Sequence, residues 1–182
     1  MSQCQPFPSL LPATWLLTDE RSDAALVRAI TRLPPGSAVV YRHYHLAPVA
    51  RLERFRQVER LARAQGHLLI LADSAMTARE WGADGIYGAP RALAPTRRDL
   101  VTVATAHSMR EIGDANRIGA DAVMLSPVFP TRSHPGAPVL GPLRFRMLAR
   151  HASMPVIALG GMNAERAKAL PWPRFAGIDG LA

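Results

Sequence analysis

Two segments of the sequence combine residue types that suit a phosphate group. Residues 126–141 read SPVFPTRSHPGAPVLG and follow an apolar run at 122–125. Residues 155–161 read PVIALGG and repeat the arrangement, with two glycines at the end of an apolar run. Hydroxyl groups, cationic side chains and the backbone amides of glycines are common partners of an anion. We therefore predict one phosphate site that is built from two loops.

The longer loop supplies the candidate side chains Thr131, Ser133 and His134. Three prolines stiffen this loop, while its glycines allow the backbone to approach a ligand closely. A simple connection between two elements does not need this combination. We predict that Thr131 and Ser133 bind the phosphate together with the backbone of Gly160 and Gly161.

Other polar residues stand directly after apolar runs. Asp73 follows LLILA, where a carboxylate can hold Mg²⁺ through one bond while phosphate oxygens and waters complete the octahedron. The alternative for Asp73 is that it caps the N-terminus of a helix that begins near Ala75.

Two further candidates are a cation and a histidine. Arg42 follows the second run and can bind a phosphate through two parallel hydrogen bonds, or it can be an ordinary surface arginine. His107 follows the fifth run, where it can serve as a general acid or base or can hold a turn in place.

The elements that position these residues form a repeating pattern. Eight short apolar runs rich in branched residues are separated in most cases by helical patterns, of which 49–65 and 108–118 are examples. Ser108 and Glu111 form a capping box for the second of these, and Gly119 ends it. Continuous apolar runs of this kind predict parallel strands covered by helices. The runs are 14–17, 38–41, 67–71, 85–87, 100–104, 122–125, 155–159 and 175–178.

Eight β-α repeats predict an α/β protein of one domain over residues 1–182, a compact (β/α)8 TIM barrel. The alternative is an open, doubly wound sheet, but no GxGxxG follows the first run. Helices must be short near Pro90 and Pro95, because proline disfavours a long helix there. The last run lies near Ala182, so we expect the closing helix to be missing or very short, with a second subunit as a possible cover. In a barrel, all the candidate residues above meet at the carboxyl ends of the strands.

Composition limits the class of protein. The chain has 182 residues, 48% hydrophobic and 20% charged, as in an ordinary globular protein. The net charge of +8 comes almost entirely from scattered arginines that alternate with acidic residues, which favours solvated helix faces over a nucleic-acid surface. Cys4 is the only cysteine, and no apolar run reaches the roughly 18 residues that span a membrane. We expect a cytoplasmic protein without nucleic-acid or membrane partners.

The motifs TAHS, GADAVMLSPVFPTRSHPGAPVLG and PVIALGGMN occur in an order and spacing that resemble the family of thiamine phosphate synthase and its thiazole tautomerase relatives. WLLTDE, LLILADS and WGADGIY are weaker landmarks of the same family. The resemblance implies a (β/α)8 barrel that joins a pyrimidine diphosphate to a thiazole phosphate and releases pyrophosphate with the help of Mg²⁺. Thr131, Ser133 and Gly161 match the positions that hold the thiazole phosphate. Positions for the diphosphate or Mg²⁺ are matched by Arg42, Asp73 and Thr105.

The chain departs from the family pattern mainly at the diphosphate positions. The second Mg²⁺ carboxylate of the pattern falls near Pro90 and Arg91, and the lysine after the phosphate loop is His134. Further departures are Val40 and Tyr44 in place of a glutamine and a lysine, Ala72 in place of an asparagine, and Tyr87 in place of a histidine. The segment after the eighth run, which in the family adds backbone donors to the phosphate, is represented by Leu181 and Ala182. The resemblance therefore implies an eroded diphosphate half and an intact thiazole-phosphate half.

Three functions follow from this asymmetry. In the first, a transferase of the synthase type uses Thr131 and Ser133 for the thiazole phosphate, Arg42 and His134 for pyrophosphate, and Asp73 for Mg²⁺. In the second, a thiazole tautomerase binds one phosphorylated thiazole and moves a proton with His107. In the third, the barrel is a phosphate-binding module without catalysis.

Overall fold

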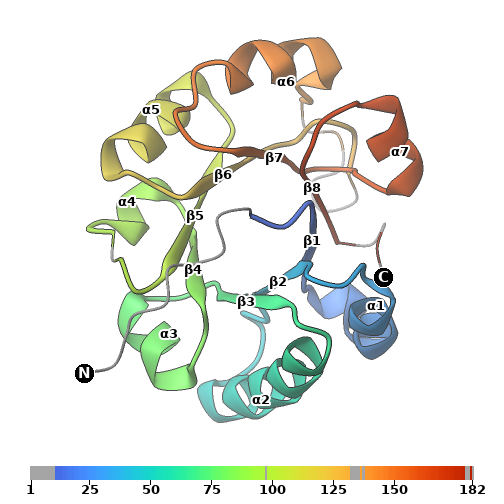
Figure 1. The fold of residues 1–182 in the computed structure, drawn as a ribbon, viewed down its shortest axis with the longest axis vertical. Helices are drawn as coiled ribbons and strands as arrows, with labels where there is room; N and C mark the ends of the chain where they lie inside the picture. The colour runs from blue at the N-terminus through green and yellow to red at the C-terminus, as the bar shows by residue number, and fades with distance from the viewer. Residues whose placement is uncertain (1–10, 97, 132–135, 137, 179–180, 182) are drawn as a thin grey trace.

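The structure is a computed structural model that describes residues 11–96, 98–131, 136, 138–178 and 181. Eight parallel strands close into a barrel in sequence order, and helices lie outside it (Figure 1). The strands are β1 (Thr14–Leu17), β2 (Ala38–Tyr41), β3 (Leu68–Leu71), β4 (Gly85–Gly88), β5 (Val101–Ala106), β6 (Ala122–Leu125), β7 (Val156–Ala158) and β8 (Phe175–Gly177). The predicted (β/α)8 barrel is confirmed.

The helices that cover the barrel differ greatly in length. Their bounds are η1 (Glu20–Ala25), α1 (Leu26–Arg32), α2 (Pro48–Ala64), α3 (Ala75–Trp81), α4 (Pro90–Leu93), α5 (Met109–Ile118), α6 (Gly141–Ala149) and α7 (Ala164–Ala169). The helix at the prolines is a single turn, as its sequence predicts. Short helices of this kind allow eight β-α units to fit into a chain well below the usual size of about 250 residues.

Closure of the barrel is seen in the pairing of its first and last strands. Thr14 of β1 lies beside Phe175 of β8, and Trp15 of β1 lies beside Ala38 of β2. An open doubly wound sheet would leave two unpaired edges, so that alternative is wrong. Because every strand is parallel, all the carboxyl ends lie at one mouth of the barrel.

The strands bury both faces, which explains their continuous apolar sequences. One buried cluster lies inside the barrel and includes Trp15, Val40, Ile70 and Met124. The other lies between strands and helices and includes Leu16. A side chain at Gly85 would meet the Val101 carbonyl at 2.3 Å, so the barrel interior has no room for a larger residue there.

Local capping sets several helix ends. The Ser108 side chain accepts a hydrogen bond from the Glu111 backbone N–H at the start of α5, and Gly119 ends that helix with a left-handed φ of 67°. Asn163 caps α7 in the same way. The cap of α3 is Ser74, so the alternative assignment of Asp73 as this N-cap is wrong.

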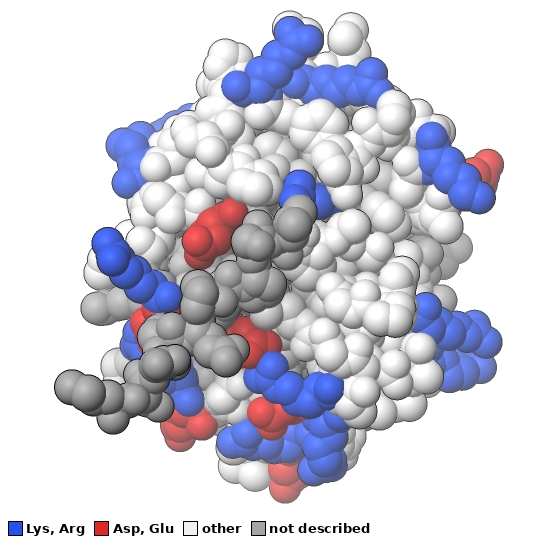
Figure 2. Space-filling view, in the orientation of Figure 1, with Lys and Arg blue, Asp and Glu red and all other residues white. Residues whose placement is uncertain are grey.

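Charged side chains are spread widely over the molecule. On the face that Figure 2 shows, basic side chains lie at separate places around the rim, and several have acidic neighbours. Arg54 pairs with Asp23 at 2.8 Å, and Arg63 pairs with Asp84 at 2.7 Å. None of the helices formed by the described residues is both long and apolar enough to cross a membrane.

Candidate active site at the barrel mouth

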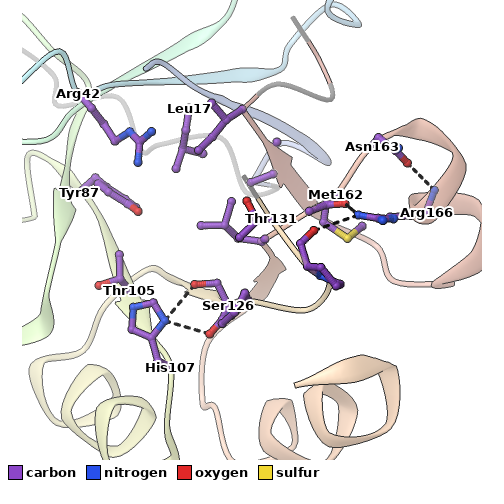
Figure 3. A pocket seen from close by; sticks show the side chains of 18 of the residues that line it. Leu17, Arg42, Tyr87, Thr105, His107, Ser126, Thr131, Met162, Asn163 and Arg166 are labelled. Carbon is purple, nitrogen blue, oxygen red and sulfur yellow. Dashed lines mark hydrogen bonds between the residues drawn. The ribbon is translucent and has the colours of Figure 1, made fainter. Parts of the chain in front are cut away.

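A cavity of about 900 Å³ opens among the carboxyl ends of the strands. Its volume is in the range of sites for small molecules. Apolar side chains such as Leu17, Leu159 and Ile178 line part of it, which suits a flat organic ring. Figure 3 shows Arg42 and Tyr87 on one side and Arg166 on the other, with Thr131 between them. The cavity thus offers polar groups on opposite sides of an apolar region.

The loop after β6 and the glycines after β7 form one wall of the cavity. The Val128 backbone N–H donates to the Leu159 carbonyl at 2.9 Å, and the Phe129 N–H donates to the Gly160 carbonyl at 3.0 Å. The two ends of the loop after β6 are also bonded to each other, since the Leu140 N–H donates to the Pro127 carbonyl at 2.9 Å. The two segments that the sequence identifies as phosphate-binding therefore lie side by side at the barrel mouth.

The two glycines are required by this packing. Gly160 has a φ of +95°, and a Cβ there would lie 2.5 Å from the Pro127 Cα. Gly161 has a φ of +62°, and its Cβ would lie 2.4 Å from the Pro130 carbonyl oxygen. Both the positive φ values and the short distances exclude a larger residue. The glycines bring their backbone to the cavity wall, where an anion can approach it.

Arg166 of α7 ties the same two segments together. Its Nη1 donates to the Gly161 carbonyl at 2.5 Å and to the Pro130 carbonyl at 3.4 Å. Its guanidinium also lies 5.2 Å from the centre of the Phe129 ring. The side chain lines the cavity, so it adds a positive charge beside the glycines. The sequence patterns did not identify Arg166, because its role depends on how α7 is oriented over the loop.

The candidate side chains of the phosphate loop are only partly described. Thr131 lines the cavity beside Gly160 and Gly161. Ser133 and His134 lie outside the described residues. Their predicted roles in phosphate and pyrophosphate binding therefore stay predictions.

Arg42 lies at the opposite side of the cavity and is held by its neighbours. Its Nε donates to the Thr18 carbonyl at 2.8 Å, its backbone N–H donates to the Thr18 hydroxyl at 3.0 Å, and its Nη2 donates to Asp19 at 2.9 Å. Burial alone would raise the pKa of Asp19, but hydrogen bonds from Arg21 and the charge of Arg42 hold that pKa below its usual range. The guanidinium is thus oriented before any ligand arrives.

A buried histidine lies behind Arg42. The His43 Nδ1 lies 2.7 Å from the Thr18 hydroxyl, and its Nε2 lies 2.8 Å from an Asp23 oxygen. The ring stacks on Tyr41 at 4.7 Å between centroids. His43 has a φ of 35°, which a non-glycine residue seldom adopts. Burial lowers the pKa of His43, although the bond to Asp23 opposes this, so the imidazole is neutral in the fold.

Asp73 pairs with Arg51, whose side chain is largely buried, and does not line the cavity described above. Its Oδ2 accepts from Arg51 Nη1 at 2.5 Å, and its Oδ1 accepts from the Ser74 backbone N–H at 2.7 Å. Burial alone would raise the pKa of Asp73, but the bonds from Arg51 and Ser74 outweigh it and lower the pKa. Within the part of the chain that the structure describes, no three His, Cys, Asp or Glu side chains cluster as metal ligands would. The donor set around Asp73 does not fit Mg²⁺.

The remaining candidates lie between the two sides of the cavity. The Thr105 hydroxyl donates to the Gly88 carbonyl at 3.4 Å. Burial raises the pKa of Tyr87 to about 12, so its hydroxyl stays protonated and can donate to an anion. The His107 Nδ1 lies 3.0 Å from the Ser126 carbonyl, which makes this nitrogen the donor, so that in the neutral form of the imidazole the lone pair is on Nε2. All three residues line the cavity, with His107 placed to accept or return a proton.

Comparisons with known proteins identify the family. The profile of the family described as thiamine monophosphate synthase (TMP-TENI) matches residues 14–182. A thiamine-phosphate synthase of Chloroflexus aurantiacus is 33% identical over 91% of this chain and 78% of its own length. One from an Azoarcus species is also 33% identical, over 92% of this chain and 85% of its own length.

Solved structures agree on the architecture. A thiamine phosphate pyrophosphorylase from Pyrococcus furiosus superposes with a TM-score of 0.75 over 91% of this chain and 85% of that chain, at 24% identity. A 3-hexulose-6-phosphate synthase superposes with a TM-score of 0.63 at 11% identity over 91% of this chain and 89% of that chain. At these identities, the superpositions show a shared fold.

Proposed function

Because the chain belongs to the thiamine monophosphate synthase family, we propose that it is a transferase of thiamine biosynthesis. The reaction joins a pyrimidine diphosphate to a thiazole phosphate and releases pyrophosphate. The observation that carries this proposal is the single cavity in which Thr131, Gly160 and Gly161 stand opposite Arg42. It has room for two substrates and places a polar group at each end.

The thiazole phosphate is assigned to the wall formed by the loop after β6 and the glycines after β7. Thr131 and the backbone beside Gly160 and Gly161 receive the phosphoryl oxygens, and Arg166 contributes charge from behind them. Ser133 belongs to the same assignment. The apolar part of the cavity receives the thiazole ring, so that its nitrogen faces the pyrimidine.

The pyrimidine diphosphate is assigned to the opposite side. In the reaction, the bond between the pyrimidine methylene carbon and a diphosphate oxygen breaks, and the pair of electrons leaves with the diphosphate. The lone pair of the thiazole nitrogen then forms the new C–N bond to that carbon. We assign the binding of the departing, negatively charged diphosphate to Arg42, Thr105 and His134. A charge-assisted contact of this kind commonly contributes about 3 kcal/mol.

The sequence predicts Mg²⁺ at Asp73, and in this family the ion would neutralise the departing pyrophosphate. The oxygens of Asp73 are engaged by Arg51 and Ser74, so no step of the reaction is derived through the metal. The positive charge that neutralises the leaving group must then come from this chain's own arginines. Arg42 lines the cavity and is already oriented by Thr18 and Asp19, which removes the need for reorganisation during the reaction.

The test is direct synthesis. Purified protein is incubated with both substrates, with and without Mg²⁺, and thiamine phosphate and pyrophosphate are measured together. The proposal expects equal amounts of the two products. Saturable binding of thiazole phosphate without any coupled product under either condition would refute it.

His107 supports a second candidate, a thiazole tautomerase. The bond between its Nδ1 and the Ser126 carbonyl fixes the tautomer, so Nε2 can take a proton from one ring position and return it to another. Such an isomerisation needs neither Mg²⁺ nor a diphosphate site. In an assay with a thiazole phosphate carboxylate, isomerisation that is lost in His107→Asn while ligand binding remains would select this function over the transferase.

A further inference from the structure

The guanidinium of Arg51 fills a cluster of oxygens at the ends of β2 and β3. Its Nε donates to the Arg42 carbonyl at 3.1 Å, its Nη2 to the Ala72 carbonyl at 3.0 Å, and its Nη1 to Asp73 at 2.5 Å. The Arg51 side chain is only 11% exposed. Three oxygens from two neighbouring strand ends therefore converge on one largely buried cation.

Aromatic rings hold the same guanidinium in place. Its central carbon lies 5.4 Å from the Trp81 ring centre, 5.5 Å from that of Tyr44 and 5.9 Å from that of Tyr41. Aromatic rings of this kind attract a cation through their negatively charged faces. Because α2 carries Arg51 and packs against the barrel, the side chain is supported from several directions. It is part of the folded structure and is not a free surface arginine.

The positive charge of Arg51 makes this cluster unfavourable for a divalent ion. Mg²⁺ requires oxygen ligands at about 2.0–2.1 Å in an octahedron. The carboxylate oxygens of Asp73 already accept bonds from Arg51 and Ser74. A metal bound to Asp73 would lie beside the positive guanidinium, and the two charges would repel each other. The described residues also provide no group of three metal-binding side chains.

We propose that Arg51 is a permanent internal cation at this corner of the barrel, and that the protein therefore binds its diphosphate-type anion without a divalent ion. The identity of the anion rests on the proposed function. Arg51 acts as a positioning residue, because its bond to the Arg42 carbonyl joins it to the arginine that lines the cavity. Arg42 then meets the anion directly.

The first experiment measures the binding of inorganic pyrophosphate by calorimetry. Protein freed of metals is titrated once in the presence of a chelator and once with excess Mg²⁺. We expect Kd values that agree within about threefold, because the protein supplies its own cations. Binding that requires Mg²⁺ would overturn the inference, and so would the absence of binding under both conditions.

The second experiment examines the oxygen cluster with Mn²⁺ as a probe, followed by electron paramagnetic resonance. In the absence of pyrophosphate, which would itself bind Mn²⁺, the wild type is expected to leave Mn²⁺ in its free, hydrated form. If the wild type binds Mn²⁺ and Asp73→Asn removes this binding, Asp73 is a metal ligand and the inference is wrong. Neither result depends on whether the protein turns over any substrate.

Variants of Arg51 test whether the guanidinium takes the place of a metal. Arg51→Gln is expected to weaken pyrophosphate binding about tenfold, and Mg²⁺ is expected to restore part of this loss. Arg63→Gln is the matched control, since Arg63 lies on the same helix and pairs with Asp84. A normal affinity in folded Arg51→Gln would contradict the role of Arg51. If this variant does not fold, the two wild-type experiments still decide.

The test of metal-free pyrophosphate binding can fail or succeed independently of the test of the proposed transferase activity. Protein that binds pyrophosphate equally well with chelator and with Mg²⁺, but forms no thiamine phosphate, would refute the transferase and leave this inference standing. Protein that forms thiamine phosphate only when Mg²⁺ is added, and binds pyrophosphate only then, would refute this inference and support the transferase.

Discussion

Arg42 reaches its position through bonds to the backbone and side chains of its own neighbours. Thr18 contributes both its carbonyl and its hydroxyl oxygen, and Asp19 adds a carboxylate. A lysine has no planar fork that could reach these groups and an anion at the same time. Charge alone is therefore not sufficient at this position.

Replacing Arg42 by lysine tests this argument. We expect Arg42→Lys to lower kcat/KM for thiamine phosphate formation by about 10²-fold, although the net charge is unchanged. Steady-state kinetics measure the effect. Arg63→Lys, which changes a surface ion pair with Asp84, serves as the control and is expected to be neutral. Comparable losses in both variants would contradict a special role for Arg42.

His43 predicts a pH dependence of stability. Its pKa is lowered by burial, so on acidification the unfolded chain takes up a proton near the ordinary histidine pKa of about 6.5 while the folded protein does not. The stabilising contribution is therefore fully present above that pH and is lost as the pH falls below it. The slope is at most about 1.4 kcal/mol per pH unit for a single group.

Urea unfolding between pH 8 and pH 5 measures this slope. His43→Asn is the informative variant, because asparagine tolerates a positive φ better than most residues but cannot ionise. We expect a flatter dependence on pH together with a lower stability, since Thr18 and Asp23 each lose one of their hydrogen-bond partners. An unchanged slope in this variant would show that other groups cause it.

At the scale of elements, the wall of the cavity depends on the two glycines after β7. An alanine at Gly160 or Gly161 would be strained by its φ and would clash with the backbone of the preceding loop. We expect either substitution to cost about 1–3 kcal/mol of unfolding free energy and to weaken the binding of thiazole phosphate. Chemical denaturation and calorimetry measure the two effects.

Gly113 is the matched control for these substitutions. It lies within α5, its φ is not positive, and a Cβ there would meet no atom within 4 Å. Gly113→Ala is expected to be neutral or to stabilise by about 0.5–1 kcal/mol, because alanine favours a helix. If all three alanine variants behaved alike, the packing of the two segments would not be the reason for the glycines.

The elements themselves were largely predictable because their signals are local. The cap at Ser108 and the end at Gly119 are observed where the sequence predicts them. β5 was predicted to end at Ala104 but continues to Ala106, so Thr105 belongs to the strand. Strand ends depend on pairing with neighbouring strands, which periodicity alone does not define.

The contacts between elements were not predictable. The sequence predicts Asp73 as a metal ligand, whereas the structure pairs it with Arg51 from the middle of α2. Arg166 reaches the phosphate loop from α7 in a comparable way. Both contacts depend on how a helix is rotated about its axis against the barrel. Hydrophobic spacing determines which face is buried but not which polar atom a long side chain reaches.

At the scale of the whole molecule, a single closed sheet joins all the elements. The inner cluster contains Trp15, which is fully buried, and the outer layer contains Trp81 at 7% exposure. Because β1 pairs with β8, the barrel has no free edge, and the same strands carry both layers on their two faces. The barrel is therefore expected to unfold as one unit.

Two probes can check this expectation. Tryptophan fluorescence reports on the buried indoles, and far-ultraviolet circular dichroism reports on the helices. We expect the same denaturation midpoint from both in guanidinium chloride. Two separated transitions would show that part of the chain folds independently of the barrel.

The binding of thiazole phosphate to the purified protein tests the central claim most directly. The account predicts one saturable site in calorimetry, with the unphosphorylated thiazole bound at least about 10²-fold more weakly, because the wall at Thr131, Gly160 and Gly161 recognises the phosphoryl group. Equal binding of the two compounds, or a Kd for thiazole phosphate that Gly161→Ala leaves unchanged, would contradict it.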